Sequence, residues 1–152
     1  MVIEMRRVEV GVDDANDLLN KAGLPNLNSM EILQGGWDNT NILLTLSDAS
    51  KVVLKVWNAN TVEEVRRVVA RHCHLDENGI PTAVPIQLAN GNLITEKGGM
   101  SWTLLPFIEG GMLGTDENSL KSLGENLARL HQIPAADCFP DDYRMGLSLI
   151  HI

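Results

Sequence analysis

The stretch QGGWDNTNILLTLSDASKVVLKVW, residues 34–57, combines a glycine-rich turn with two β-rich runs. Residues 39–46 and 52–57 are rich in branched and apolar side chains, and turn-forming residues separate them, which predicts two consecutive antiparallel strands. The run Met30–Gln34 predicts a further strand on the other side of the Gly35-Gly36 turn. This stretch therefore predicts an antiparallel sheet with a glycine turn between two of its strands.

Helical patterns flank these strands. Val12–Ala22 predicts a short helix that Gly23 can close. Thr61 followed three residues later by Glu64 is a capping box, which predicts a helix over Val62–Glu77. Leucines at helical spacing predict a last, amphipathic helix over Asp116–Gln132.

The middle of the chain predicts the rest of the sheet. Val84–Leu88 and Asn92–Glu96 are expected to be strands joined by an Asn90-Gly91 hairpin turn, and Ser101–Ile108 is expected to be the last strand. The order of elements predicts an α+β fold, with an antiparallel sheet of about five strands and one helix packed on it.

Composition excludes several function classes. The 152 residues are 44% hydrophobic and 21% charged, which is typical of a packed domain. The formal net charge of −8 disfavours a nucleic-acid or anionic-membrane partner. Two cysteines are too few for a disulfide framework, and no apolar run reaches the ~18 residues of a membrane span. A cytoplasmic location is expected.

Lys55 is a candidate for binding an anion. It lies among apolar neighbours, and a lysine buried in such a strand needs an anionic partner. Kinases place such a lysine on the third strand, where it pairs with phosphates and with a helix glutamate. Because strand side chains alternate, Lys55 shares a face with Val53 and Trp57, and an exposed lysine on an edge strand is equally compatible with the pattern.

Two further features have two readings each. Glu64 lies at the edge of the apolar face of its helix, whereas Glu63 lies towards solvent, so Glu64 is the better candidate to pair with Lys55. The capping box is an alternative reason for a glutamate at this position. Trp102–Gly111 runs from a strand into glycines. That pattern is typical of a hinge between two lobes, and equally of a buried strand followed by a loop.

The order of these motifs resembles the aminoglycoside phosphotransferase family. That family includes choline, homoserine and methylthioribose kinases and shares the protein-kinase fold. The resemblance covers roughly residues 28–131. It rests on Gly-Gly-Trp-Asp-Asn-Thr-Asn-Ile from Gly35, Val-Val-Leu-Lys-Val from Val52, Asn-Gly-Ile-Pro from Asn78, Phe-Ile-Glu-Gly from Phe107 and Leu-Gly-Glu-Asn-Leu-Ala-Arg-Leu-His from Leu123.

The resemblance implies an ATP-dependent kinase that acts with Mg²⁺ on the hydroxyl of a small molecule. The Gly-Gly-Trp-Asp-Asn-Thr-Asn stretch favours a homoserine-kinase-like member of the family. Lys55, held by an acidic residue of the helix, would contact the ATP phosphates, and the Pro106 C=O and Ile108 N–H would hydrogen-bond adenine. The nucleotide-covering loop would consist of Gly35, Gly36, Asp38, Asn39 and Asn41.

The sequence departs from the family pattern in two ways. Val68 stands where many members have the helix glutamate. The catalytic His-Gly-Asp loop, its metal-binding Asn and the later metal-binding Asp are missing, so the chain alone is expected to be inactive, with metal ligands only in a missing second lobe. A non-catalytic pseudokinase or an interaction module is the alternative.

These features predict four regions. They are an N-terminal helical extension (1–27), a nucleotide-binding kinase-like N-lobe (28–108), a hinge with the start of a truncated C-lobe (109–146), and the last six residues (147–152). The last region resembles a translated sequencing adapter, and an ordinary C-terminal strand is its alternative interpretation.

Overall fold

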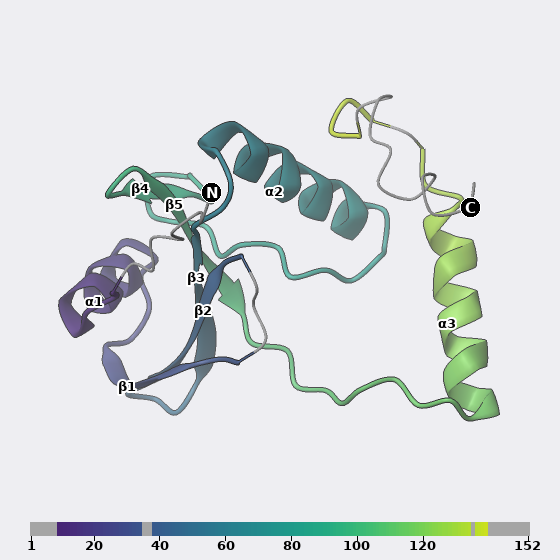
Figure 1. The fold of residues 1–152 in the computed structure, drawn as a ribbon, viewed down its shortest axis with the longest axis horizontal. Coiled ribbons are helices and arrows are strands. Elements are labelled where there is room, and N and C mark those ends of the chain that lie inside the picture. Colours follow the sequence, from purple (N-terminus) through teal and green to yellow (C-terminus); the bar gives the residue numbers. More distant parts are fainter. Residues whose placement is uncertain (1–8, 35–37, 135, 140–152) are drawn as a thin grey trace, which may run out of the picture.

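The computed structural model describes residues 9–34, 38–134 and 136–139. Within these ranges, five strands form one antiparallel sheet in the order β1-β2-β3-β5-β4 (Figure 1). The strands are β1 (Leu27–Ile32), β2 (Thr40–Leu46), β3 (Lys51–Trp57), β4 (Thr95–Lys97) and β5 (Met100–Pro106). The five-stranded antiparallel sheet confirms the predicted fold class.

Three helices accompany the sheet in the described ranges: α1 (Val12–Lys21), α2 (Val62–Glu77) and α3 (Glu117–Leu130). Helix α2 has the predicted bounds, and its capping box is formed. The Glu64 N–H donates to Thr61 Oγ1 at 3.2 Å, and the Thr61 N–H donates to Glu64 Oε2 at 2.7 Å. A local sequence signal thus fixes the start of this helix.

The prediction of a strand over residues 84–88 is wrong. These residues form an irregular segment that joins the sheet through the Ile86 N–H, which donates to the Leu104 carbonyl of β5 at 2.7 Å. The neighbouring Pro85 has no N–H to donate to a ladder, which disfavours a regular strand here. The Asn90-Gly91 turn does form, but the hairpin of the sheet lies at Gly98-Gly99, where both φ angles are positive as a tight β4–β5 turn requires.

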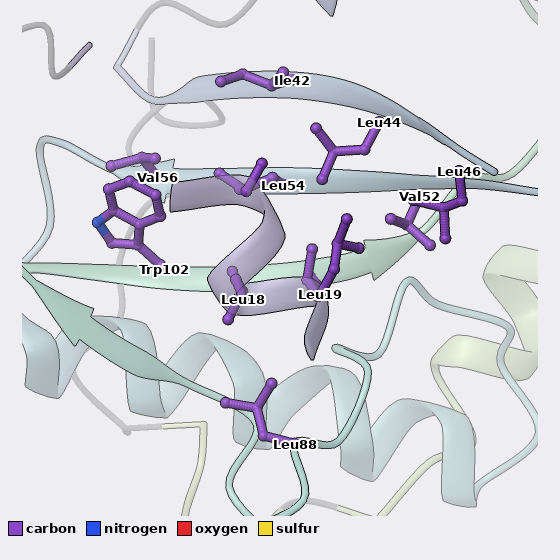
Figure 2. Packing of buried hydrophobic residues seen from close by; sticks show 12 residues of the cluster. Leu18, Leu19, Ile42, Leu44, Leu46, Val52, Leu54, Val56, Leu88 and Trp102 are labelled. Atoms are coloured by element: carbon purple, nitrogen blue, oxygen red, sulfur yellow. The ribbon is translucent and has the colours of Figure 1, made fainter. Parts of the chain in front are cut away.

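Helix α1 covers one face of the sheet and completes the main hydrophobic core. Figure 2 shows Leu18 and Leu19 of α1 among side chains of the strands. We call this surface the closed face. Its buried strand residues are Ile42, Leu44, Leu46, Val52, Leu54, Val56, Trp102 and Leu104.

Helix α2 packs at one end of the opposite face. Val65 and Val69 of α2 bury themselves against Trp57, the last residue of β3. The segment after α3 returns to the other end of α2, since Arg71 Nε donates to the Cys138 carbonyl at 2.7 Å and His74 Nε2 donates to the Pro134 carbonyl at 3.0 Å.

Helix α3 lies away from the sheet, at the end of an extended connector (Figure 1). None of its residues is buried, and its leucines are exposed, namely Leu120, Leu123, Leu127 and Leu130. Among the described residues, no helix has the length and apolar character needed to cross a bilayer.

Candidate functional site

Strand register creates a second, less covered face of the sheet. In β2, β3 and β5, Lys55 lies opposite Asn41 on one side and Thr103 on the other. Residues directly opposite one another in a ladder point to the same face. The next row on this face is apolar and half-buried. We call the surface formed by both rows and Trp57 the open face; its residues are Asn41, Leu43, Val53, Lys55, Trp57, Thr103 and Leu105.

Lys55 lies in the middle of this open face, on the central strand of the sheet. It is half-buried, and it forms no ion pair within the part of the chain that the structure describes. Burial lowers the pKa of its ammonium group. A partly desolvated cation without a carboxylate carries an uncompensated cost, so an anionic ligand would bind favourably here.

An aromatic ring lies beside Lys55 among the described residues. The Lys55 Nζ lies 3.9 Å from the centroid of the Trp57 ring, which is a close cation–π contact. The ring is fixed in turn, because Trp57 Nε1 donates to Thr103 Oγ1 at 3.1 Å in a buried hydrogen bond. Trp57 therefore connects Lys55 both to β5 and, through its packing, to α2.

Glu64 does not reach Lys55 in this structure. Its side chain is exposed and engaged at the start of α2, where hydrogen bonds from Thr61 hold the pKa of its carboxyl below its ordinary value. Val68 packs instead beside Trp57. The proposed contact of Glu64 with the nucleotide site stays a prediction, and the capping role is the one that the geometry describes.

The predicted nucleotide-covering loop is described in part. Gly35 and Gly36 lie outside the described residues. Asp38 is exposed, and the buried Asn39 Oδ1 has no hydrogen-bond partner among the residues that the structure describes. Of the predicted loop residues, Asn41 is the one that the register brings beside Lys55.

The predicted hinge lies at the end of β5. Pro106 is the last residue of that strand and pairs with Val52 of β3. Ile108 follows in the connector and is 65% exposed. Pro106 and Lys55 therefore lie on adjacent strands, β5 and β3.

Sequence reasoning missed the roles of Trp57 and Thr103. The alternation of side chains places Trp57 on the face of Lys55, and this signal was available in the sequence. Thr103 gives no such signal, because its place beside Lys55 depends on the register between β3 and β5.

Nowhere in residues 9–34, 38–134 and 136–139 do three or more His, Cys, Asp or Glu side chains gather as metal ligands.

A separate hollow of about 550 Å³ lies between α2 and residues 90–96, and none of the predicted site residues lines it.

Comparison with known proteins identifies the family. Residues 29–148 match the model of the phosphotransferase enzyme family. A homoserine kinase from Polaromonas naphthalenivorans (strain CJ2) is 29% identical, over 81% of this chain and 39% of the relative. A homoserine kinase from Bradyrhizobium diazoefficiens is 26% identical, over 81% of this chain and 38% of the relative.

A solved structure shares the fold. It is a spectinomycin phosphotransferase in complex with ADP and spectinomycin, with a TM-score of 0.67 and 18% identity, over 85% of this chain and 40% of that chain. The chain thus spans about two fifths of the length of the relatives it matches. Since the family model covers most of the sequence and the sheet and α2 form a kinase-like N-lobe, the chain belongs to the phosphotransferase enzyme family.

Proposed function

We propose that this chain is the nucleotide-binding N-terminal part of an ATP-dependent small-molecule kinase. The observation that carries the proposal is Lys55, a half-buried ammonium on the open face without a carboxylate partner in the described structure. The phosphates of ATP supply the anionic partner that this lysine lacks. Neutralising charge on the transferred phosphoryl group is the main task of a protein in this chemistry.

The open face has an apolar part and a cationic part, which suit the two ends of a nucleotide. Leu43, Val53 and Leu105 form a half-buried apolar row across three strands. Adenine would lie against this row, with its edge at the backbone of Pro106 and Ile108. The phosphates would extend to Lys55, under a loop that includes Gly35, Gly36, Asp38 and Asn39.

The acceptor is proposed to be a hydroxyl of a small metabolite. Two relatives that match 81% of the chain are homoserine kinases, so homoserine is the first acceptor to test. The catalytic aspartate and the Mg²⁺ ligands would lie in a second lobe, and the chain by itself would bind nucleotide without transferring phosphate. A cytoplasmic location, where ATP is available, goes with this proposal.

An acylating derivative of ATP tests the proposal on the chain itself. An acyl group on the terminal phosphate of ATP is transferred to an amine that lies beside the phosphates. We expect Lys55 to be acylated and free ATP to suppress the reaction, as measured by mass spectrometry of tryptic peptides. Lys51 is the matched control, because it lies on the same strand and the same face but is exposed.

A non-catalytic pseudokinase or interaction module is the second candidate. It is favoured by α2, which packs Val68 against the cluster that contains Trp57, while Glu64 is engaged with Thr61 at the start of the helix. This candidate predicts that Lys55 is acylated no faster than Lys51 and that ATP changes neither rate. In a protein carrying both lobes, the kinase proposal predicts that Lys55→Ala lowers turnover by about 10²–10³-fold, the usual cost of removing a charge-stabilising donor.

A further inference from the structure

The structure raises the question of what holds Lys55 in place. A lysine side chain has four rotatable bonds and is strongly hydrated, so it needs a partner to keep one position. Glu64, the carboxylate that the sequence offers as a partner for Lys55, is engaged with Thr61 at the start of α2. The contact that Lys55 makes is with the Trp57 ring, 3.9 Å from Nζ to the centroid.

Trp57 is itself held from two sides. Trp57 is 6% exposed and packs against Val65 and Val69 of α2. Its indole N–H donates to the hydroxyl of Thr103, which is 1% exposed. A ring with a fixed plane gives the ammonium a fixed place to sit, because the attraction is strongest above the centre of the ring.

We propose that Trp57 is the positioning residue of Lys55, and that its indole ring holds the ammonium at the open face for the phosphates of a nucleotide, in the place of a helix carboxylate. This inference rests on the proposed function. It also links the position of α2 to the phosphate site, because the Trp57 side chain packs against α2 and also contacts Lys55.

An aromatic partner has a different chemical consequence from a carboxylate. A ring attracts the cation without neutralising its charge, so the full positive charge of Lys55 stays available to phosphate oxygens. A carboxylate would raise the pKa of the lysine, whereas burial here lowers it. Binding of an anion and protonation of Lys55 should therefore support one another.

The contact can be measured by NMR on the chain with ¹³C-dimethylated lysines, a modification that keeps the positive charge. The ring current of an indole moves methyl resonances above it upfield. We expect the Lys55 signal, assigned by its loss in Lys55→Arg, to lie upfield of the signals of exposed lysines. Trp57→Leu should return it to their position, and Trp57→Phe should keep part of the displacement.

Trp102→Phe is the matched control. Trp102 lies in the same sheet and is as buried as Trp57, but it belongs to the closed face. Its indole N–H has no hydrogen-bond partner among the described residues, so the substitution removes no bond seen there. Trp102→Phe should leave the Lys55 resonance unchanged.

Titration with Mg²⁺-ATP then tests the role in binding. Trp57→Leu should weaken the affinity about three- to tenfold, which is the size expected of a partly desolvated cation–π contact. Thr103→Val keeps the ring but removes the acceptor of its N–H, and should weaken binding by a smaller factor. This variant and Trp57→Phe keep an aromatic ring in the core and serve if Trp57→Leu does not fold.

The outcomes separate this inference from the proposed function. If ATP binds wild type and the Trp57 variants equally, and the Lys55 resonance is the same in all, Trp57 is not the positioning residue and the kinase proposal is unaffected. If ATP does not bind wild type at all, the proposed function fails, and the phosphate role of Trp57 fails with it. Weaker binding together with loss of the upfield displacement supports both.

Discussion

The two faces of the sheet are built from the same strands but differ in their cover. On the closed face, Leu44, Leu54 and Leu104 are at most 1% exposed, because α1 lies over them. On the open face, the adjacent Val53 and Leu105 are only half-buried. Both faces carry apolar side chains. The closed face contributes stability because α1 buries it, whereas the open face keeps apolar surface available to a ligand.

The charge follows the same division. The closed face is a cluster of buried hydrophobic residues, whereas the open face carries Lys55 at its centre. A full ammonium under α1 would lack both water and an anion, which would be costly. On the open face it keeps partial access to solvent and an aromatic contact with Trp57. The candidate site therefore lies where the packing of the helices ends.

The largest expected effect compares leucines on the two faces. Leu54→Ala removes a fully buried side chain from the closed face and should lower the free energy of unfolding by about 2–5 kcal/mol. Leu43→Ala on the open face should cost only about 1 kcal/mol, because its side chain is partly hydrated already. Urea denaturation measures both, and equal losses would contradict the division between the faces.

A smaller effect concerns α2, which borders the open face. Thr61→Ala removes the side-chain cap of this helix and should lower stability by about 1 kcal/mol. Glu64→Gln should also destabilise the chain while leaving the pKa of Lys55 unchanged. A change in the Lys55 pKa, followed by NMR titration of the methylated lysine, would show that Glu64 acts on Lys55 after all.

The capping carboxylate also predicts a dependence on acid. Hydrogen bonds from Thr61 lower the pKa of Glu64, so the folded state binds its proton less readily than the unfolded chain does. The stability that Glu64 contributes is therefore present above its ordinary pKa of 4.5 and is lost as the pH falls through the folded value. In Glu64→Gln this part of the acid dependence should be missing from thermal melts recorded between neutral and acid pH.

The smallest expected effect concerns Lys55 of β3 at alkaline pH. Because burial lowers the pKa of Lys55, the unfolded chain binds more protons than the folded chain between the folded pKa and the ordinary value of 10.5. Wild type should therefore gain stability relative to Lys55→Met as the pH rises through this window. An equal dependence of stability on pH in wild type and Lys55→Met across this window would argue against burial as the cause.

Local sequence signals predicted most of the sheet and the bounds of α2, because a capping box and turn residues act over a few positions. They failed where a distant partner decides. Residues 84–88 have the composition of a strand, but they are irregular. Pro85 has no N–H to donate, and the segment joins β5 through the hydrogen bond from the Ile86 N–H to the Leu104 carbonyl. Short-range patterns cannot show such a choice.

The candidate site, like the fold, could be predicted from the sequence only in part. Alternation placed Lys55 and Trp57 on one face, but the packing of α1 against the other strand face decides which side stays open. Glu64 fitted both a cap and a lysine partner in the sequence, and only the geometry of α2 separates the two. Thr103 enters the site through the β3–β5 register, which no local signal encodes.

Methyl NMR with saturating Mg²⁺-ATP can locate the nucleotide on one of the two faces. We expect the methyl resonances of the open face to move, namely those of Leu43, Val53 and Leu105, while those of Leu44, Leu54 and Leu104 on the closed face move little. Lys55→Ala should abolish most of the change. No shift at all, or shifts confined to residues beside the hollow between α2 and residues 90–96, would contradict a nucleotide site on the open face.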